Sequence, residues 1–216
     1  MEHQLTIKKT VRYFTYGNPK AKTIWIVLHG YSQLPEFFIK KFETLDPNKN
    51  YVVAPEGMHR FYRRGTSGRV GASWMTKEAR LDDIADNIHY LDTLYNELSA
   101  KNSYKNRILL GFSQGGATAA RWHYSGNFKA QHFILWASVF PPDLPIEKEP
   151  FSIFQSNNYF VVGKEDQYFK DNLQAVEDFF KKQQFDIEII YFEEDHDIYP
   201  KTLKEVSQLI KMKVLR

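Results

Sequence analysis

Short apolar runs recur along the chain, and longer, partly polar segments separate each run from the next. The runs are rich in valine, isoleucine and aromatic residues and almost continuously apolar, which is typical of β-strands buried on both faces. Strands of this kind belong to parallel sheets, because helices then cover both faces of the sheet. The runs that fit this pattern are residues 23–30, 51–55, 107–112, 132–138, 159–163 and 187–192.

Amphipathic helix patterns lie between these runs. Apolar residues recur at three- and four-residue spacing within residues 81–98, 169–180 and 203–210, which predicts a helix in each segment. We expect shorter helices over residues 36–44 and directly after Ser113. Strands that alternate with helices predict βαβ crossovers and a doubly wound, mostly parallel α/β sheet flanked by helices.

Two segments depart from this alternation. Residues 5–17 alternate less regularly, so we expect either an antiparallel edge strand or a hairpin there. Residues 139–157 are rich in proline and predict a long irregular loop over one end of the sheet. This loop is too short to be a domain, and a chain of 216 residues predicts a single domain, residues 1–216.

The composition narrows the expected location. The chain contains no cysteine, which fits a reducing compartment. Its first residues lack the basic stretch and apolar run of a secretory signal, and its apolar stretches fall far short of the ~20 residues of a membrane-spanning helix. We therefore expect a cytoplasmic protein without a membrane span.

The charge distribution excludes one class of partner. The formal net charge is +3, and the densest basic cluster contains Arg60, Arg63, Arg64 and Arg69. Nucleic-acid binders usually carry a stronger basic stripe or a recognisable motif, so we expect no nucleic-acid partner. The cluster has two interpretations, a solvated loop and a site for an anionic group.

The sequence Gly111-Phe112-Ser113-Gln114-Gly115 joins a predicted strand to a predicted helix. It fits the pattern Gly-x-Ser-x-Gly, in which a nucleophilic serine occupies a sharp, strained turn and the glycines let neighbouring segments approach. A pattern this short also occurs by chance, and the alternative is an ordinary serine in a tight turn. The strand before the turn and the small residues after it favour a nucleophilic Ser113.

A serine hydroxyl is a weak nucleophile and needs a general base. In turns of this kind an acid and then a histidine follow the serine along the chain. His123 and His132 also follow Ser113, but they lie in a predicted helix and a predicted strand. His196 follows a late strand, in a loop at the edge of the sheet to which the serine turn also points, so we expect it to be the base. The alternative is a surface histidine among acids.

The acid should follow the strand before that histidine, where it can orient the imidazole and stabilise the imidazolium. Asp166 is our candidate, and Glu165 is a nearby alternative. Asp195 and Asp197 flank the histidine directly, but adjacent side chains rarely turn to face the neighbouring ring. We expect these two carboxylates to be solvated or tuning groups.

The reaction also needs two donors for the negative oxygen of its transition state. The backbone amide of Gln114, directly after the nucleophile, is the first candidate. The second is the amide of Tyr31, in the loop after the first central strand, where His29 and Gly30 predict a tight turn. Taken alone, this turn is best interpreted as an ordinary strand end. The triad candidates that follow it along the chain favour a role in binding the transition-state oxygen.

At these positions the chain resembles the α/β-hydrolase superfamily, and most of all its phospholipase/carboxylesterase branch, which includes acyl-protein thioesterases. The resemblance implies an α/β-hydrolase fold with a minimal lid or none. It also implies hydrolysis of small-molecule carboxylic esters or thioesters without a metal or organic cofactor. The segments that carry it are residues 27–31, 111–119, 163–166 and 196–198.

The chain also departs from that branch. Ser32 and Gln33 stand where the branch usually has a glycine and an acid, and Asp195 stands where a glycine usually precedes the triad histidine. Residues 60–84 follow the branch closely only at Trp74. We therefore expect a divergent esterase, and we do not carry over protein deacylation.

The substrate pocket is less constrained by the sequence. Loops at the expected strand ends carry large apolar side chains that could line an acyl site or pack in the core. These candidates are Met58, Phe61, Tyr62, Trp74, Phe140 and Tyr168. Two other functions fit the same residues: a dienelactone-type hydrolase or small peptidase on the same fold, and a non-catalytic binding module.

Overall fold

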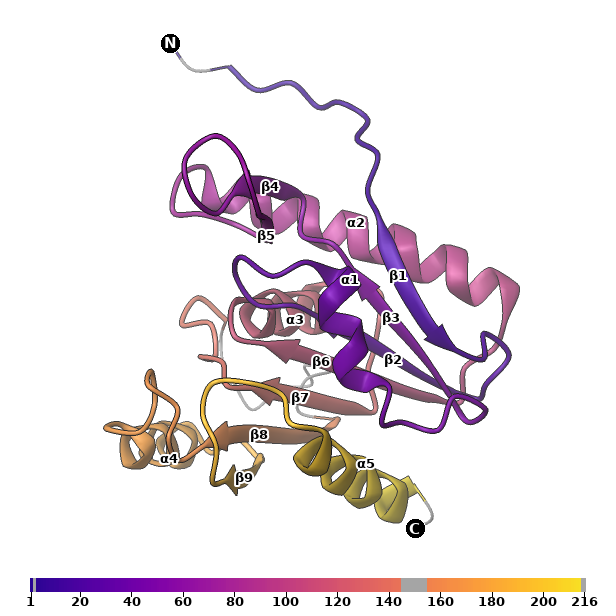
Figure 1. Cartoon of the computed structure of the whole chain (residues 1–216), viewed down its shortest axis with the longest axis vertical. Helices are drawn as coiled ribbons and strands as arrows, with labels where there is room; N and C mark the ends of the chain where they lie inside the picture. The colour runs from indigo at the N-terminus through magenta and orange to yellow at the C-terminus, as the bar shows by residue number, and fades with distance from the viewer. Residues whose placement is uncertain (2, 145–154, 215–216) are drawn as a thin grey trace.

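The structure is a computed structural model that describes residues 1, 3–144 and 155–214. Within these residues, a seven-stranded sheet forms the centre of the molecule (Figure 1), with the strand order β1-β3-β2-β6-β7-β8-β9. Its strands are β1 (Tyr13–Gly17), β2 (Thr23–Leu28), β3 (Asn50–Pro55), β6 (Asn106–Phe112), β7 (His132–Trp136), β8 (Asn157–Gly163) and β9 (Glu188–Phe192). Every neighbouring pair is parallel except β1 with β3, which is antiparallel.

The apolar runs of the sequence form the central strands because they are buried on both faces. Every residue of β3 and β7 is buried, and so is every residue of β2 after Thr23. All four tryptophans of the chain are almost fully buried, and they pack with phenylalanines into one continuous core. Of the two alternatives for residues 5–17, the structure has the edge strand, β1, which begins only at Tyr13.

The helices cover both faces of the sheet. Figure 1 shows α1 and α5 in front of the sheet and α2 behind it. Helix α3 packs beside α2, where the Trp122 indole donates a 2.8 Å hydrogen bond to Asp92. The helical segments are α1 (Pro35–Phe38), the 3₁₀ helix η1 (Ile39–Phe42), α2 (Arg80–Lys101), α3 (Gln114–Ser125), α4 (Leu173–Lys182) and α5 (Pro200–Val214).

The apolar stripe expected over residues 81–98 is buried only toward the end of α2. Leu91, Leu94 and Leu98 are buried, whereas Leu81 at the start of the helix is 73% exposed. The first turns of α2 contact the preceding loop through polar groups instead, since the Asn87 side-chain amide donates a hydrogen bond to the Trp74 carbonyl and the Asp83 carboxylate accepts one from the Thr76 amide.

A second, two-stranded sheet follows β3, and the sequence did not predict it. Its strands β4 (His59–Tyr62) and β5 (Val70–Ser73) pair antiparallel and form a hairpin. A bridge between Gln33 and Ala72 joins the hairpin to the loop after β2. All four arginines of the basic cluster, expected in a loop or an anion site, therefore lie on or between these strands.

The structure tests only part of the long irregular loop predicted for residues 139–157, because residues 145–154 lie outside the described part of the chain. Residues 139–144 form no helix or strand, as expected. Asp143 in this stretch pairs through both carboxylate oxygens with Arg121 of α3, at 2.9 and 2.6 Å. This pair attaches the segment after β7 to α3.

Candidate active site

Ser113 occupies a sharp turn between β6 and α3. Its backbone has φ 52° and ψ −122°, a conformation that residues other than glycine rarely adopt. The Ser113 amide donates a 2.9 Å hydrogen bond to the carbonyl of Trp136 at the end of β7, which holds the turn against the next strand. A strained serine between strand and helix is the geometry of a nucleophile elbow.

The two glycines of the motif let three chain segments approach at this turn. A Cβ at Gly111 would overlap the backbone of Gly116, and a Cβ at Gly115 would overlap the carbonyl of Leu28 at the end of β2. Both contacts are with backbone, which cannot move aside as a flexible side chain could. Glycine is therefore required at both positions for α3 to begin this close to the sheet.

His196 and Asp166 contact each other beside this turn. The Nδ1 atom of His196 lies 2.6 Å from Oδ2 of Asp166, whose side chain is fully buried. The other oxygen, Oδ1, accepts a 2.9 Å hydrogen bond from the Tyr168 amide. Because an ionised carboxylate only accepts hydrogen bonds, the Nδ1 atom carries the proton, which leaves the Nε2 lone pair free to act as a base.

The alternative acids lie elsewhere. Glu165 is exposed. The Asp195 carboxylate accepts a hydrogen bond from the hydroxyl of Tyr199, and the Asp197 carboxylate forms an ion pair with Lys41 at 2.6 Å. Each flanking carboxylate therefore has a partner other than the imidazole.

A cavity of about 290 Å³ contains both Ser113 and His196 in its wall. Small or apolar side chains form much of the remaining surface, and the loops after β7 and β8 supply most of them. The imidazole is flanked by the rings of Phe112 and Tyr168, with ring centroids 4.9 and 4.7 Å away. The other lining residues are Gln114, Ala117, Ala137, Ser138, Val139 and Phe169.

No hydrogen bond joins the Ser113 hydroxyl to His196 in the described part of the chain; the two side chains share the cavity wall. In known serine hydrolases, the contact between the nucleophile and the base often tightens only when substrate binds.

Of the six side chains expected to line the substrate pocket, only Tyr168 is among the residues that line this cavity. Trp74 is fully buried and donates a 2.8 Å hydrogen bond to the His29 carbonyl, and Phe140 is buried beside Phe179, so neither side chain lines this cavity.

The remaining three candidates, Met58, Phe61 and Tyr62, lie in or next to β4 of the hairpin, and none of them lines this cavity. Met58 is half-buried against the core, Tyr62 is half-exposed, and the Phe61 ring stacks on the ring of Tyr31 at 5.1 Å.

The two amides expected to bind the transition-state oxygen are unused in the structure. Within the described residues, neither the Tyr31 amide nor the Gln114 amide donates a hydrogen bond. The neighbouring amides are occupied, since Gly30 donates to the Gln33 side chain at 2.8 Å and Ser32 donates to the Ala72 carbonyl at 2.9 Å. Gln114 is also the first residue of α3, where a helix leaves its amide without an internal partner.

His29 holds the loop after β2 in place, a role that the sequence did not indicate. Its Nδ1 atom lies 2.8 Å from the Gly30 carbonyl, and its Nε2 atom accepts a 3.0 Å hydrogen bond from the Gly57 amide. Burial lowers the pKa of His29 to about 4, so the ring is neutral at physiological pH. A neutral ring with one donor and one acceptor matches both contacts.

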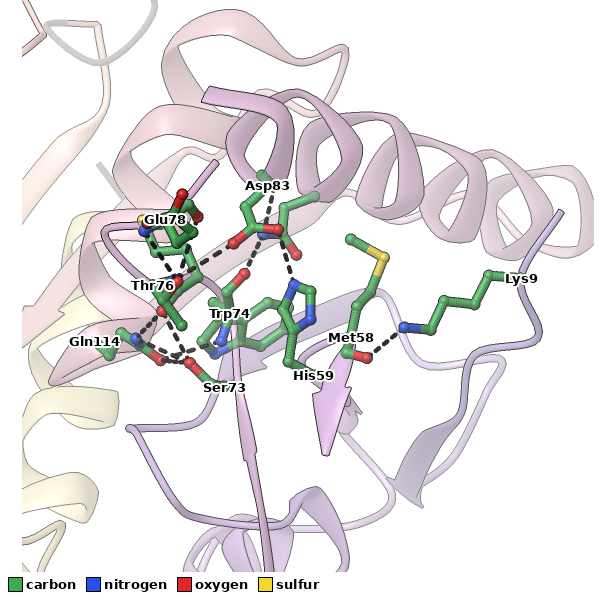
Figure 2. Close-up of polar contacts among 11 residues, drawn as sticks. Lys9, Met58, His59, Ser73, Trp74, Thr76, Glu78, Asp83 and Gln114 are labelled. Atoms are coloured by element: carbon green, nitrogen blue, oxygen red, sulfur yellow. Dashed lines mark hydrogen bonds and ion pairs between the residues drawn. The ribbon is translucent and has the colours of Figure 1, made fainter. Parts of the chain in front are cut away.

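The Gln114 side chain connects the elbow to the chain after β5 (Figure 2). Its Nε2 atom donates a 2.8 Å hydrogen bond to the Met75 carbonyl, and its Oε1 atom accepts from the Trp74 amide at 3.1 Å and lies 3.2 Å from the Ser73 hydroxyl. The sequence indicated a role for the Gln114 amide and gave no sign of these side-chain contacts.

The same network continues to α2 and the hairpin (Figure 2). The Thr76 amide donates a 3.3 Å hydrogen bond to Asp83, and the other carboxylate oxygen of Asp83 lies 2.8 Å from Nε2 of His59 in β4. On the other side of the hairpin, the Lys9 ammonium donates a 2.6 Å hydrogen bond to the Met58 carbonyl. The elbow, α2 and the hairpin are therefore linked by side chains.

The described residues lack two further features. No group of three or more histidine, cysteine, aspartate or glutamate residues there could hold a metal ion. No helix there is both long enough and apolar enough to cross a membrane.

No protein-family profile and no curated protein sequence matches the chain. Solved structures do match. Esterase PE8 is 18% identical with a TM-score of 0.69, over 94% of this chain and 99% of that one. A Mesorhizobium loti carboxylesterase is 14% identical with a TM-score of 0.70, over 93% and 94%. Zea mays acyl-protein thioesterase 2 is 16% identical with a TM-score of 0.69, over 93% and 98%.

These similarities cover nearly the whole chain, and they agree with the mostly parallel sheet and with the absence of a large lid among the described residues. Identities this low establish the fold alone. The chain therefore has the α/β-hydrolase fold expected from its sequence, with carboxylesterases, a thioesterase and a phospholipase/carboxylesterase among its structural neighbours.

Proposed function

We propose that this protein is a serine hydrolase that cleaves a carboxylic ester or thioester through a Ser113–His196–Asp166 triad. The observation that carries the proposal is the 2.6 Å contact between His196 and a fully buried Asp166, in a cavity that also contains the strained Ser113. The esterases and thioesterases among the structural neighbours support the same reaction class.

In the first half of the proposed reaction, Nε2 of His196 takes the proton of Ser113 while the serine oxygen attacks the acyl carbon. The imidazole becomes positively charged, and the Asp166 carboxylate stabilises this charge through Nδ1. The proton then passes from Nε2 to the leaving alcohol or thiol, the bond to the leaving group breaks, and an acyl-serine ester remains.

The carbonyl oxygen gains negative charge in each transition state, and we assign its stabilisation to the free amides of Tyr31 and Gln114. In the second half, His196 takes a proton from water, the resulting hydroxide attacks the acyl-serine, and the proton returns to the Ser113 oxygen as the acid product leaves. The side chains named here suffice for both halves, and no step requires a cofactor.

The cavity supports a compact acyl group. Its volume of about 290 Å³ lies just below the roughly 300–1,000 Å³ typical of ligand pockets. Alanines at 117 and 137 leave room beside the nucleophile, and the exposed Tyr168 ring forms one wall.

A fluorophosphonate probe tests the nucleophile directly. We expect the probe to label the folded protein at Ser113 and to leave Ser113→Ala unlabelled, because attack on phosphorus uses the same activated hydroxyl. A panel of acyl esters and thioesters of graded chain length should be cleaved by the wild type. Ser113→Ala should lose about 10³-fold or more in kcat.

A folded wild-type protein that neither reacts with the probe nor cleaves any ester would contradict the proposal. Circular dichroism of both proteins is the folding control. The non-catalytic binding module would then be the better interpretation of the same fold.

A further inference from the structure

We propose that the β4–β5 hairpin is an anion-recognition arm, and that the preferred substrate carries a carboxylate or phosphate on the part that lies outside the acyl cavity. This inference rests on the proposed hydrolase function. Three features carry it: the unpaired arginines of the hairpin, its attachment to the loop of Tyr31, and its position across the nucleophile from the cavity.

The tip of the hairpin carries positive charge without compensating carboxylates. Among the described residues, Arg63, Arg64 and Arg69 form no ion pair within 4 Å and are exposed. Arg60 differs from them, because it lies 3.5 Å from the buried Glu56, which also pairs with Arg12. The free guanidinium groups are therefore the three nearest the tip.

Two of these arginines lie opposite each other. Tyr62 pairs with Val70 in the hairpin register, and at the next position the Arg63 amide donates a 2.9 Å hydrogen bond to the Arg69 carbonyl. Like charges directly opposite on paired strands are destabilising, and an anion between them relieves the repulsion. The arrangement opposes hairpin stability and favours a bound negative group.

The arm is attached to the catalytic loop. The Phe61 ring stacks on the ring of Tyr31, whose amide we assign to the oxyanion hole, and the Ser32 amide bonds to the Ala72 carbonyl of β5. Arg63 lies two residues beyond Phe61, a rise of about 7 Å along a strand. Side chains alternate between faces, so continuing the alternation by one position places Arg63 on the face of Phe61.

The sheet order puts the arm and the cavity on opposite sides of the nucleophile. Ser113 follows β6, the cavity loops follow β7 and β8 on one side, and the loop of Tyr31 and the hairpin follow β2 and β3 on the other. A substrate whose carbonyl carbon is at Ser113 and whose acyl group fills the cavity therefore extends its leaving group across the Tyr31 and Phe61 rings. Its charged end then approaches the arginines.

The test uses aryl acetates in which the phenol carries an alkyl chain of graded length ending in a carboxylate. Each is matched with its primary amide, and a second series ends in a phosphate. The carboxylate or phosphate should raise kcat/KM about tenfold over the neutral partner at low salt, and the ratio should fall as salt is added. The series with the larger ratio identifies the preferred anion.

Two triple variants locate the effect. Arg63→Gln/Arg64→Gln/Arg69→Gln should bring the ratio of charged to neutral substrate to about one. The control, Lys20→Gln/Lys22→Gln/Lys105→Gln, removes the same charge from exposed lysines near the amino ends of β2 and β6, and it should keep the wild-type ratio. Because each ratio is taken within one protein, a general loss of activity does not change it.

If the wild type cleaves the neutral esters but does not prefer the charged ones, the anion-recognition role of the hairpin is wrong and the hydrolase proposal is unaffected. A preference that survives the arginine variant, or that the lysine variant loses equally, would also overturn the assignment to the hairpin. If no ester is cleaved faster than by Ser113→Ala, both proposals fail.

Discussion

At the scale of single residues, the contact between Asp166 and His196 is the part of the site with the sharpest chemical consequence. The buried carboxylate accepts one hydrogen bond from the Tyr168 amide and one from the imidazole. The amide contact fixes the carboxylate, and the carboxylate then fixes the ring orientation and its tautomer. A neutral amide side chain in its place would keep the shape and remove the charge.

Asp166→Asn should therefore reduce kcat by about 10³–10⁴-fold, because the side chain can donate to Nδ1 and favour the wrong tautomer. Initial-rate kinetics with an ester substrate measure this loss, and thermal unfolding checks that the variant folds. Asp195→Asn is the matched control, since Asp195 adjoins His196 in the chain but contacts Tyr199. Equal losses in the two variants would argue against Asp166 as the orienting acid.

At the scale of elements, ion pairs of Asp143 attach the segment after β7 to two helices, since Asp143 contacts Arg121 of α3 at 2.6 Å and Arg80 of α2 at 3.6 Å. Arg121 of α3 is only 5% exposed, and both oxygens of Asp143 accept hydrogen bonds from its guanidinium. These hydrogen bonds lower the pKa of Asp143. The pair connects α3, which begins directly after Ser113, to the segment whose residues Ser138 and Val139 line the cavity.

Asp143→Ala should lower the free energy of unfolding by about 2 kcal/mol, because it leaves a buried guanidinium unpaired; partial exposure of Asp143 keeps the loss below that of a fully buried pair. Urea unfolding measures the change. The double variant Arg121→Met/Asp143→Ala should recover most of it, since no charge is then left buried. A double variant as unstable as Asp143→Ala would show that packing, and not the charge, dominates.

The same scale separates what the sequence could predict from what it could not. The central strands and α5 carry strong apolar patterns, so burial decides their structure and the predictions succeed. The hairpin has no such pattern, because its strands have only four residues each and β4 is mostly exposed, and a bridge to the loop after β2 holds it in place. Chain order and the predicted strand ends selected Asp166 and His196, and the structure brings their side chains into contact. The contacts of His29 and the Gln114 side chain depend on distant segments that meet only in the folded chain.

At the scale of the whole molecule, buried histidines couple folding to pH. Burial lowers the pKa of His29, of His123 and of His132 to about 4, below the ordinary value of about 6.5. Between these values the unfolded chain binds more protons than the folded chain. Each histidine thus contributes stability that is fully present above about pH 6.5 and is lost as the pH falls toward about 4.

We therefore expect the free energy of unfolding to fall by up to about 1.4 kcal/mol per pH unit for each histidine below about pH 6. Urea unfolding at a series of pH values measures this slope. His132→Asn should reduce the slope by about one proton, whereas His89→Gln, at an exposed position on α2, should leave it unchanged. If His132→Asn leaves the slope of the unfolding free energy against pH unchanged, His132 does not contribute to the pH dependence of stability.

The hairpin has a consequence for how such an enzyme could diversify. Its base is connected to the loop of Tyr31 and, through Ser73, to the elbow, whereas no atom lies within 4 Å of the place that a Cβ would take at Gly65 or Gly68 in its tip. We therefore expect insertions, deletions and charge changes in the tip to leave Ser113, His196 and the Tyr31 loop in their positions. For the same reason, we expect library selection confined to residues 63–69 to change the preferred substrate of the proposed hydrolase without loss of its activity.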